Sequence, residues 1–252
     1  MIFPGAVSAQ PRSRALTPAA MVVRLSWKAD DTGNVEGKRW KMGWIHKLAG
    51  DKRTNEQRQA VSLNRKALIA MEKGKLDEAE LQLEEALRLA PELADVHHNL
   101  GAVYLAQKKF SQAQRHIRRA VRLDPEDVES RVALAKVYAD MGKAGEAMAA
   151  YRDSCARFPE DWRAQLSLGN ALLENGRLED ATAHLEKAAA LKPQEDMVHL
   201  VLAAAYERLG QMDAAIREYE AVRKVSKIAQ NRSAAAEKVK ALRSTQGGKM
   251  AV

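Results

Sequence analysis

The sequence predicts an all-α protein built as a solenoid of stacked helix–turn–helix repeats and closed by a C-terminal capping helix. Alanine and leucine are abundant, whereas aromatic residues make up only 5% of the chain. This composition favours helices, because alanine and leucine lose little conformational freedom in a helix. A spacing of 34 residues recurs through the middle of the chain, and a period of this length is the signature of a repeat architecture.

Six columns of residues keep the 34-residue spacing, and proline marks it most clearly. Pro91, Pro125, Pro159 and Pro193 each lie 34 residues apart. The other columns hold small residues, large apolar residues or glycine. They are Ala79, Ala113, Ala147, Ala181 and Ala215; Ala67, Gly101, Ala135, Gly169 and Ala203; Leu83, Ile117, Tyr151, Leu185 and Tyr219; Ala86, Ala120, Ser154 and Ala188; and Gly74, Gly142, Gly176 and Gly210, with Lys108 in the remaining place. One two-helix unit is therefore predicted to recur along the chain.

Residues 94–127 show how one unit is organised. The first helix carries an apolar stripe of residues spaced by three and four, from Val96 to Tyr104, and a short turn is expected at 107–109. The second helix is predicted to begin at Phe110 and to stop at Asp124, because a proline disfavours the helical conformation of the residue before it. The small residues are expected where the two helices cross, since a larger side chain would push the backbones apart.

This pattern resembles the tetratricopeptide repeat, a 34-residue helix–turn–helix unit with small residues at the helix crossing and a proline at its end. The resemblance covers five units, at 60–93, 94–127, 128–161, 162–195 and 196–229, and it implies a right-handed α-solenoid. Two positions depart from the pattern. The first unit has Lys66 where the other four have leucine, which indicates a terminal repeat. The fifth unit has Lys227 in place of proline, so its second helix can run on.

The segment 230–243 is predicted to cap the solenoid, because an end repeat needs a cover with a polar outer face. Ile228, Ala235, Val239 and Leu242 form its apolar stripe. The residues after it, around 247–249, are expected to be frayed, so that 230–252 comprises a capping helix and a tail.

The flanks carry the positive charge of the chain, whose formal net charge is +8. Residues 1–59 hold 11 basic and 5 acidic residues, residues 60–229 hold 25 and 27, and residues 230–252 hold 5 and 1. Because the solenoid itself is nearly neutral, nucleic-acid binding through the basic tails is only the third hypothesis for function.

Residues 1–59 are predicted to be a largely disordered N-terminal segment with an amphipathic helix near 40–50. Residues 1–29 contain no acidic residue, which is typical of organellar transit peptides. The favoured interpretation is instead a disordered tail, or extra sequence upstream of a start at Met21 or Met42. Trp40, Trp44, Ile45 and Leu48 lie on one helical stripe among basic residues. Such a helix could sit on an anionic membrane surface; the alternative is that it covers the first repeat.

No constellation of catalytic, cofactor-binding or metal-binding residues is found in the sequence. There is no phosphate-binding loop, no nucleophile elbow and no second cysteine for zinc. Cys155 stands at an apolar helix position and is interpreted as a packing residue. His97 and His98 are adjacent and should point in different directions on a helix, which argues against a metal site.

The resemblance implies that the first helix of each unit lines a concave groove. Helical spacing from the second residue of these helices selects a stripe of mixed polarity, suited to an extended peptide or a helix. The candidate partner-binding residues are Asn64, Asp95, His98, Glu129, Lys136, Arg163, Leu166, Asn170, Glu174 and Arg208. Glu129 stands where the chaperone-binding members of the family hold a carboxylate with a lysine, so binding of such chaperone tails in that register is not expected.

The favoured function is therefore a non-catalytic, cytoplasmic scaffold or assembly factor that binds a partner polypeptide in the groove. A peripheral membrane component recruited by the tryptophan-bearing segment is the alternative. Self-association of the solenoid is left open, and the location would be organellar if residues 1–29 are a transit peptide.

Overall fold

The computed structural model describes residues 54–249, with side chains described as far as Thr245. This part of the chain consists of helices and contains no strand. Five antiparallel pairs are followed by a single helix. The pairs are α3 (Asn55–Glu72) with α4 (Leu76–Leu89), α5 (Ala94–Ala106) with α6 (Phe110–Leu123), α7 (Val128–Asp140) with α8 (Ala144–Arg157), α9 (Trp162–Glu174) with α10 (Leu178–Leu191), and α11 (Asp196–Arg208) with α12 (Met212–Val225); the last helix is α13 (Ala229–Lys249).

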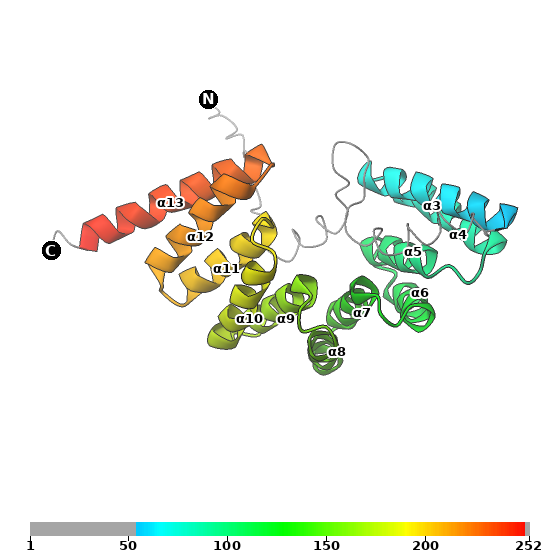
Figure 1. Ribbon diagram of the computed structural model, residues 1–252, viewed down its shortest axis with the longest axis horizontal. Helices are drawn as coiled ribbons and strands as arrows, with labels where there is room; N and C mark the ends of the chain where they lie inside the picture. Colours follow the sequence, from blue (N-terminus) through cyan, green and yellow to red (C-terminus); the bar gives the residue numbers. More distant parts are fainter. Residues whose placement is uncertain (1–53, 250–252) are drawn as a thin grey trace, which may run out of the picture.

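The pairs follow one another along an arc, as Figure 1 shows. Each helix packs most closely against the other helix of its own pair and next against the neighbouring pair. Consecutive first helices, such as α5 with α7 and α7 with α9, also contact one another, whereas the second helices make no comparable contact within the described residues. The first helices therefore line the inner, concave side of the arc, and the second helices are spread along its outer side.

Small residues hold the two helices of a repeat together at short range, as predicted. A Cβ atom added to Gly101 would lie 2.3 Å from Cγ1 of Ile117, and one added to Gly169 would lie 2.7 Å from Cγ of Leu185. Such distances are too short for side-chain carbons, so the backbones approach as closely as they do because no side chain intervenes.

The turns inside the repeats need a left-handed residue. Four of them use glycine, at φ values between +73° and +76°. In the second repeat Lys108 takes the same conformation at φ +61°. The column of glycines in the sequence thus marks a backbone requirement that Lys108 meets at some cost, because its Cβ crowds the neighbouring carbonyl oxygen.

In α5, α7, α9 and α11, the fourth residue of the helix binds the carbonyl oxygen of the repeat-ending proline before it. These contacts are His97 Nε2 to Pro91 O at 3.0 Å, Arg131 Nε to Pro125 O at 2.8 Å, Gln165 Nε2 to Pro159 O at 2.8 Å, and His199 Nε2 to Pro193 O at 3.0 Å. Each proline therefore ends the second helix of its own repeat, and its carbonyl oxygen accepts a hydrogen bond from the first helix of the next repeat. Because four positions use three different residue types, this column is hard to recognise in the sequence.

The second helix of the fifth repeat does not run on, so the expectation drawn from Lys227 is wrong. It ends at Val225, and the backbone turns extended at Ser226, with ψ 128°. The Ser226 hydroxyl donates to the buried carboxylate of Asp196 and accepts the Ile228 N–H at 3.1 Å. Asn231 on α13 donates to the same carboxylate at 2.9 Å. Buried hydrogen bonds therefore break the helix where proline is absent.

The C-terminal capping helix is present, and its apolar stripe is buried as predicted. Ala235, Val239 and Leu242 form one core cluster with residues of the fifth repeat, and Ile228 is half-buried. The helix is longer than expected, because α13 continues to Lys249 through the two glycines predicted to fray.

At the other end, α3 begins five residues ahead of the repeat frame. Thr54 caps it: the Thr54 hydroxyl accepts the Gln57 N–H, and the Gln57 side chain accepts the Thr54 N–H. Lys66 is exposed, as expected of a terminal repeat. The stripe of Trp40, Trp44, Ile45 and Leu48 lies outside the described residues.

Candidate partner-binding groove

The ten candidate residues of the groove all lie on first helices. Asn64 comes from α3, Asp95 and His98 from α5, Glu129 and Lys136 from α7, Arg163, Leu166, Asn170 and Glu174 from α9, and Arg208 from α11. Asp95, Glu129, Glu174 and Arg208 are exposed, and most of the others are half-buried. Leu166 is only 7% exposed, so its role is to pack within the solenoid more than to contact a ligand.

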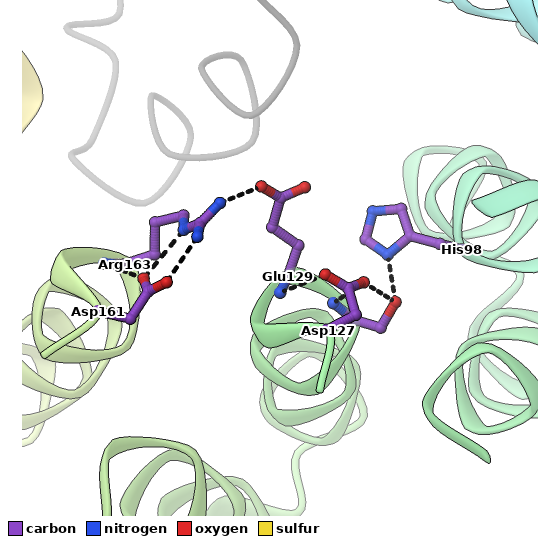
Figure 2. A network of polar contacts seen from close by, with 6 residues as sticks. His98, Asp127, Glu129, Asp161 and Arg163 are labelled. Carbon is purple, nitrogen blue, oxygen red and sulfur yellow. Dashed lines mark hydrogen bonds and ion pairs between the residues drawn. The ribbon is translucent and has the colours of Figure 1, made fainter. Parts of the chain in front are cut away.

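Arg163 stands at the centre of the groove between two carboxylates (Figure 2). Its guanidinium binds Asp161 at two points, with Nε 2.9 Å from Oδ1 and Nη2 2.5 Å from Oδ2. A third bond, from Nη1 to Glu129 Oε1 at 2.5 Å, joins α9 to α7. Burial alone would lower the pKa of Arg163, but the bonds to Asp161 and the attraction of Glu129 outweigh it and raise that pKa. Arg163 is therefore a fixed, fully charged group.

Asp161 and Asp127 hold this side of the groove in place because each caps the helix that follows it. Asp161 accepts the Arg163 N–H at 2.9 Å, and Asp127 accepts the N–H groups of Glu129 and Ser130 at 3.3 and 3.1 Å. Carboxylates are favourable at helix N-termini, where unpaired N–H groups and the helix dipole attract negative charge. Sequence analysis did not select these two residues, since both precede the first helical residue.

His98, Ser130 and Asp127 form a chain of hydrogen bonds from α5 to the start of α7 (Figure 2). The Ser130 hydroxyl donates to Asp127 Oδ2 at 2.6 Å, and its oxygen lies 2.9 Å from His98 Nδ1. Because the hydroxyl hydrogen goes to the carboxylate, the imidazole must donate from Nδ1. This polarity is opposite to that of a nucleophilic serine, whose hydroxyl donates to the histidine. Ser130 is also only 1% exposed, so the chain positions His98 and links two repeats.

Further polar pairs order the rest of the inner face. Asn99, a buried residue, donates to Asn64 Oδ1 at 2.8 Å and joins α5 to α3. Lys136 binds Asp140 at 3.0 Å, and Asn170 donates to Glu174 at 3.1 Å. The Asn170 Oδ1 atom is buried without a hydrogen-bond partner in the described part of the chain. The inner face is thus mostly pre-ordered and keeps one unsatisfied acceptor.

The inner rim, defined as Asp95, Asp127, Glu129, Asp161 and Arg163, lies at the N-terminal ends of α5, α7 and α9 and carries four carboxylates and one guanidinium. Solvent reaches the Asp95 side chain, yet the concave wall surrounds it. Burial, together with repulsion from Asp127, raises the pKa of Asp95, and attraction to His98 offsets this only in part. The rim therefore gathers four carboxylates around one arginine.

The histidines of the repeat interior and the cysteine lie apart from this surface. His97 is paired with His116, whose Nδ1 is 3.1 Å from Nδ1 of His97. Sequence analysis missed this pair, because the two residues are 19 positions apart on opposite helices of one repeat. Cys155 is 7% exposed, and burial raises the pKa of its thiol, which fits a packing role. Within residues 54–249, no three histidine, cysteine or acidic side chains are grouped as a metal ion requires.

Family models described as tetratricopeptide repeat match residues 58–126, 98–160, 132–196 and 166–227. Together these matches span residues 58–227, and the chain belongs to the tetratricopeptide repeat family. A search of curated proteins finds no match. None of the described helices is long and apolar enough to cross a membrane.

Solved structures share the fold at low sequence identity. A thermophilic tetratricopeptide repeat protein of Thermus thermophilus is 20% identical, with a TM-score of 0.64 over 71% of this chain and 98% of that one. The pilF protein of Pseudomonas aeruginosa is 18% identical, with a TM-score of 0.61 over 78% and 92%. MamA from Desulfovibrio magneticus is 20% identical, with a TM-score of 0.51 over 66% and 94%. At these identities the likeness establishes the fold alone.

Proposed function

We propose that this protein is a scaffold or assembly factor that binds a partner polypeptide along the inner faces of α5, α7 and α9. Tetratricopeptide repeat proteins generally mediate protein–protein interactions, which supports the class of function. The observation that carries the proposal for this chain is the pre-ordered polar surface on the concave side, which no described helix covers.

The order of this surface matters for binding. Binding is weakened by roughly 0.5–1.5 kcal/mol for each side chain that the ligand immobilises, because that side chain loses conformational entropy. Here Glu129, Lys136 and Arg163 already hold fixed partners. They therefore present donors and acceptors to a polypeptide without a large loss of side-chain entropy. Glu174 and Asn170 add acceptors suited to the N–H groups of an extended segment.

The test is affinity capture by the full-length chain followed by mass spectrometry. The groove variant carries Lys136→Ala, Arg163→Ala and Asn170→Ala. The matched control carries Arg115→Ala, Arg152→Ala and Gln114→Ala on the outer helices α6 and α8, which removes the same two charges and one amide. We expect retention of a specific partner to fall at least about tenfold in the groove variant, the equivalent of ~1.4 kcal/mol, and to be unchanged in the control.

Circular dichroism must show the same helix content in all three proteins. A partner retained equally by the groove variant and the control would remove the groove from the proposed function.

A further inference from the structure

We propose that the inner rim of the groove binds the chain's own basic segment, residues 38–53, and that this segment competes with the partner polypeptide. The place of this ligand on the concave side, and the competition, rest on the function proposed above. Three observations support it: an inner face that no described helix covers, the point at which the upstream chain joins the solenoid, and the opposite formal charges of the two parts.

The uncovered face is the inner side of α5, α7 and α9. The described helices that touch these three are their pair partners and their neighbours along the arc. At the N-terminal ends of the three helices, the Arg163 guanidinium is shared by Asp161 and Glu129, while Asp127 caps α7. Repulsion from Asp127 adds to burial in raising the pKa of Asp95, and the attraction of His98 does not cancel these effects. A cation placed here would relieve that repulsion.

The upstream chain joins the solenoid on the side of this rim. Contacts join near-equivalent positions of successive first helices, such as Asn64 with Asn99 and Glu129 with Arg163. The first helices therefore run side by side in the same direction, and their N-terminal ends share one edge of the arc. The chain enters α3 at that edge, where the Thr54 capping box fixes the start of the helix. Thr54 therefore lies at the edge on which Asp95, Asp127 and Glu129 stand.

The segment has the charge and the length to follow the rim. Residues 38–53 contain six basic residues and one acidic residue, a net charge of +5. A fully extended chain spans at most ~3.3–3.6 Å per residue, so these sixteen residues reach about 50 Å. Neighbouring helices are about 8–10 Å apart, so the three steps from α3 to α9 need roughly 30 Å.

The bound state would be held by many weak contacts. Pairs between exposed charges are individually weak and are screened by salt. However, a covalently attached segment is present at an effective concentration in the millimolar range for a short linker. Such a ligand can occupy the rim when no partner is present and can yield to a partner that makes better contacts.

The first test is limited proteolysis of the full-length chain by trypsin, with the cleavage rate after each lysine and arginine of 38–53 followed by mass spectrometry. The rim variant carries Asp95→Asn and Glu129→Gln, which leave the capping residues Asp127 and Asp161 intact. The matched control carries Glu179→Gln and Glu237→Gln, on α10 and α13. A free peptide of residues 38–53 reports the intrinsic rate of trypsin in each buffer.

We expect cleavage in the wild-type chain at low salt to be about five-fold slower than in the free peptide, because paired basic side chains are withheld from the protease. The rim variant should lose most of this protection, and the control should keep it. Protection should also vanish at about 1 M salt, where screening acts over roughly 3 Å. Equal rates in the wild-type chain and the rim variant, or protection that salt leaves unchanged, would overturn the proposal.

The second test measures whether the attached segment competes with a free copy of itself for the rim. A fluorescent peptide of residues 38–53 is titrated into the full-length wild-type chain and into a full-length chain carrying Lys38→Gln, Arg39→Gln, Lys41→Gln and Lys47→Gln. Because the neutralised chain has lost its own ligand, we expect it to bind the peptide several-fold more tightly. Equal affinities would contradict the proposal. If partner capture still depends on Lys136, Arg163 and Asn170 in that case, the groove function stands and only the identity of this ligand fails.

Discussion

The two ends of the solenoid are protected from water in different ways. At the N-terminal end, Lys66 replaces the leucine of the other repeats and is exposed on α3, and the apolar Ile69 on the same helix is 51% exposed. At the C-terminal end an additional helix, α13, covers the fifth repeat with a buried stripe that includes Val239. Within the described residues, these side chains of the first repeat lie at the surface, whereas the fifth repeat is covered by a further helix.

This difference shows that a terminal repeat can be stabilised either by composition or by an added element. The covered end can keep an apolar surface but needs a defined docking angle, which the hydrogen bonds among Asp196, Ser226 and Asn231 supply. No further helix of the described residues covers the first repeat. The following predictions test this contrast between the ends and between neighbouring repeats.

The largest effect is expected from a charge placed under the cover. Val239→Asp would bury an unpaired carboxylate at a position that is 4% exposed. We expect either a loss of about 3–5 kcal/mol in the free energy of unfolding or the detachment of α13 from the fifth repeat. Ile69→Asp introduces the same charge at the solvated end and should change stability by roughly 0.5 kcal/mol or less. Urea unfolding followed by circular dichroism measures both.

Equal destabilisation by the two variants would contradict the contrast between the ends. Amide exchange along α12 and α13 distinguishes local detachment of the cover from global unfolding.

A smaller loss is expected when the docking network is altered. Asp196→Asn keeps the shape of the side chain but removes an acceptor that binds both Ser226 and Asn231, so one buried donor is left unpaired. The cost should be about 1–3 kcal/mol. Asn231→Ala, which removes the other partner from α13, should make a later Asp196→Asn change less damaging in a double-mutant cycle. Strict additivity of the two changes would show that the network is not coupled.

Two equivalent pairs of positions should respond to pH in opposite directions. His97 and His116 both have lowered pKa values, chiefly through burial, and the pKa of His116 falls to about 4. The unfolded chain then binds more protons between about pH 4 and 6.5, so stability falls as pH falls through that window. The equivalent pair is His199 with Glu218, 2.7 Å apart, and hydrogen bonding to Glu218 raises the pKa of His199. The stability that this pair contributes is present below about pH 6.5 and is lost as pH rises through the pKa of His199 in the folded state.

Unfolding at pH 5 and pH 8 of His116→Gln and Glu218→Gln checks this contrast. On going from pH 8 to pH 5, the free energy of unfolding of His116→Gln should rise relative to that of the wild-type chain, and that of Glu218→Gln should fall. Each change should be about 1 kcal/mol, because both pairs are partly screened by solvent. The same pH response in both variants would refute the assignment.

The smallest effect concerns the turn of the second repeat. Lys108→Gly would relieve the left-handed conformation of a residue with a Cβ atom and should raise stability by about 0.5–1 kcal/mol. Gly142→Ala at the equivalent turn of the third repeat should have the reverse sign, although nothing lies within 4 Å of the added Cβ atom. A neutral result for both would show that these turns adjust without strain.

Much of this architecture could be predicted from the sequence because the same two-helix pattern recurs in five units. The second helix predicted to begin at Phe110 and stop at Asp124 is found at Phe110–Leu123. The small-residue column is confirmed by the close approach of Gly101 to Ile117. The stripe that places His98, Glu129 and Arg163 on first helices follows from helical spacing, and the structure brings these three side chains to one face (Figure 2). That they contact a partner stays a prediction.

The sequence did not predict the contacts between different repeats, because the residue types that form them do not recur at the 34-residue spacing. The expectation that the last repeat helix runs on was wrong, because Ser226 and Asp196, thirty positions apart, meet in the core. The pairing of Arg163 with Glu129 spans a whole repeat. The caps formed by Asp127 and Asp161 were not selected either, since they precede the helices whose spacing was used.

The sequence by itself determined the helical class, the length of each unit, the positions of its turns and the two kinds of terminal repeat. It could do so because short-range preferences, such as the effect of proline on the residue before it, act within a few positions and recur at each period. Only the tertiary structure decided which polar side chains meet across repeats, which histidine is paired with which, and which carboxylates gather on the concave face. Those outcomes depend on distances between helices that are far apart in the chain, and a local pattern does not encode such distances.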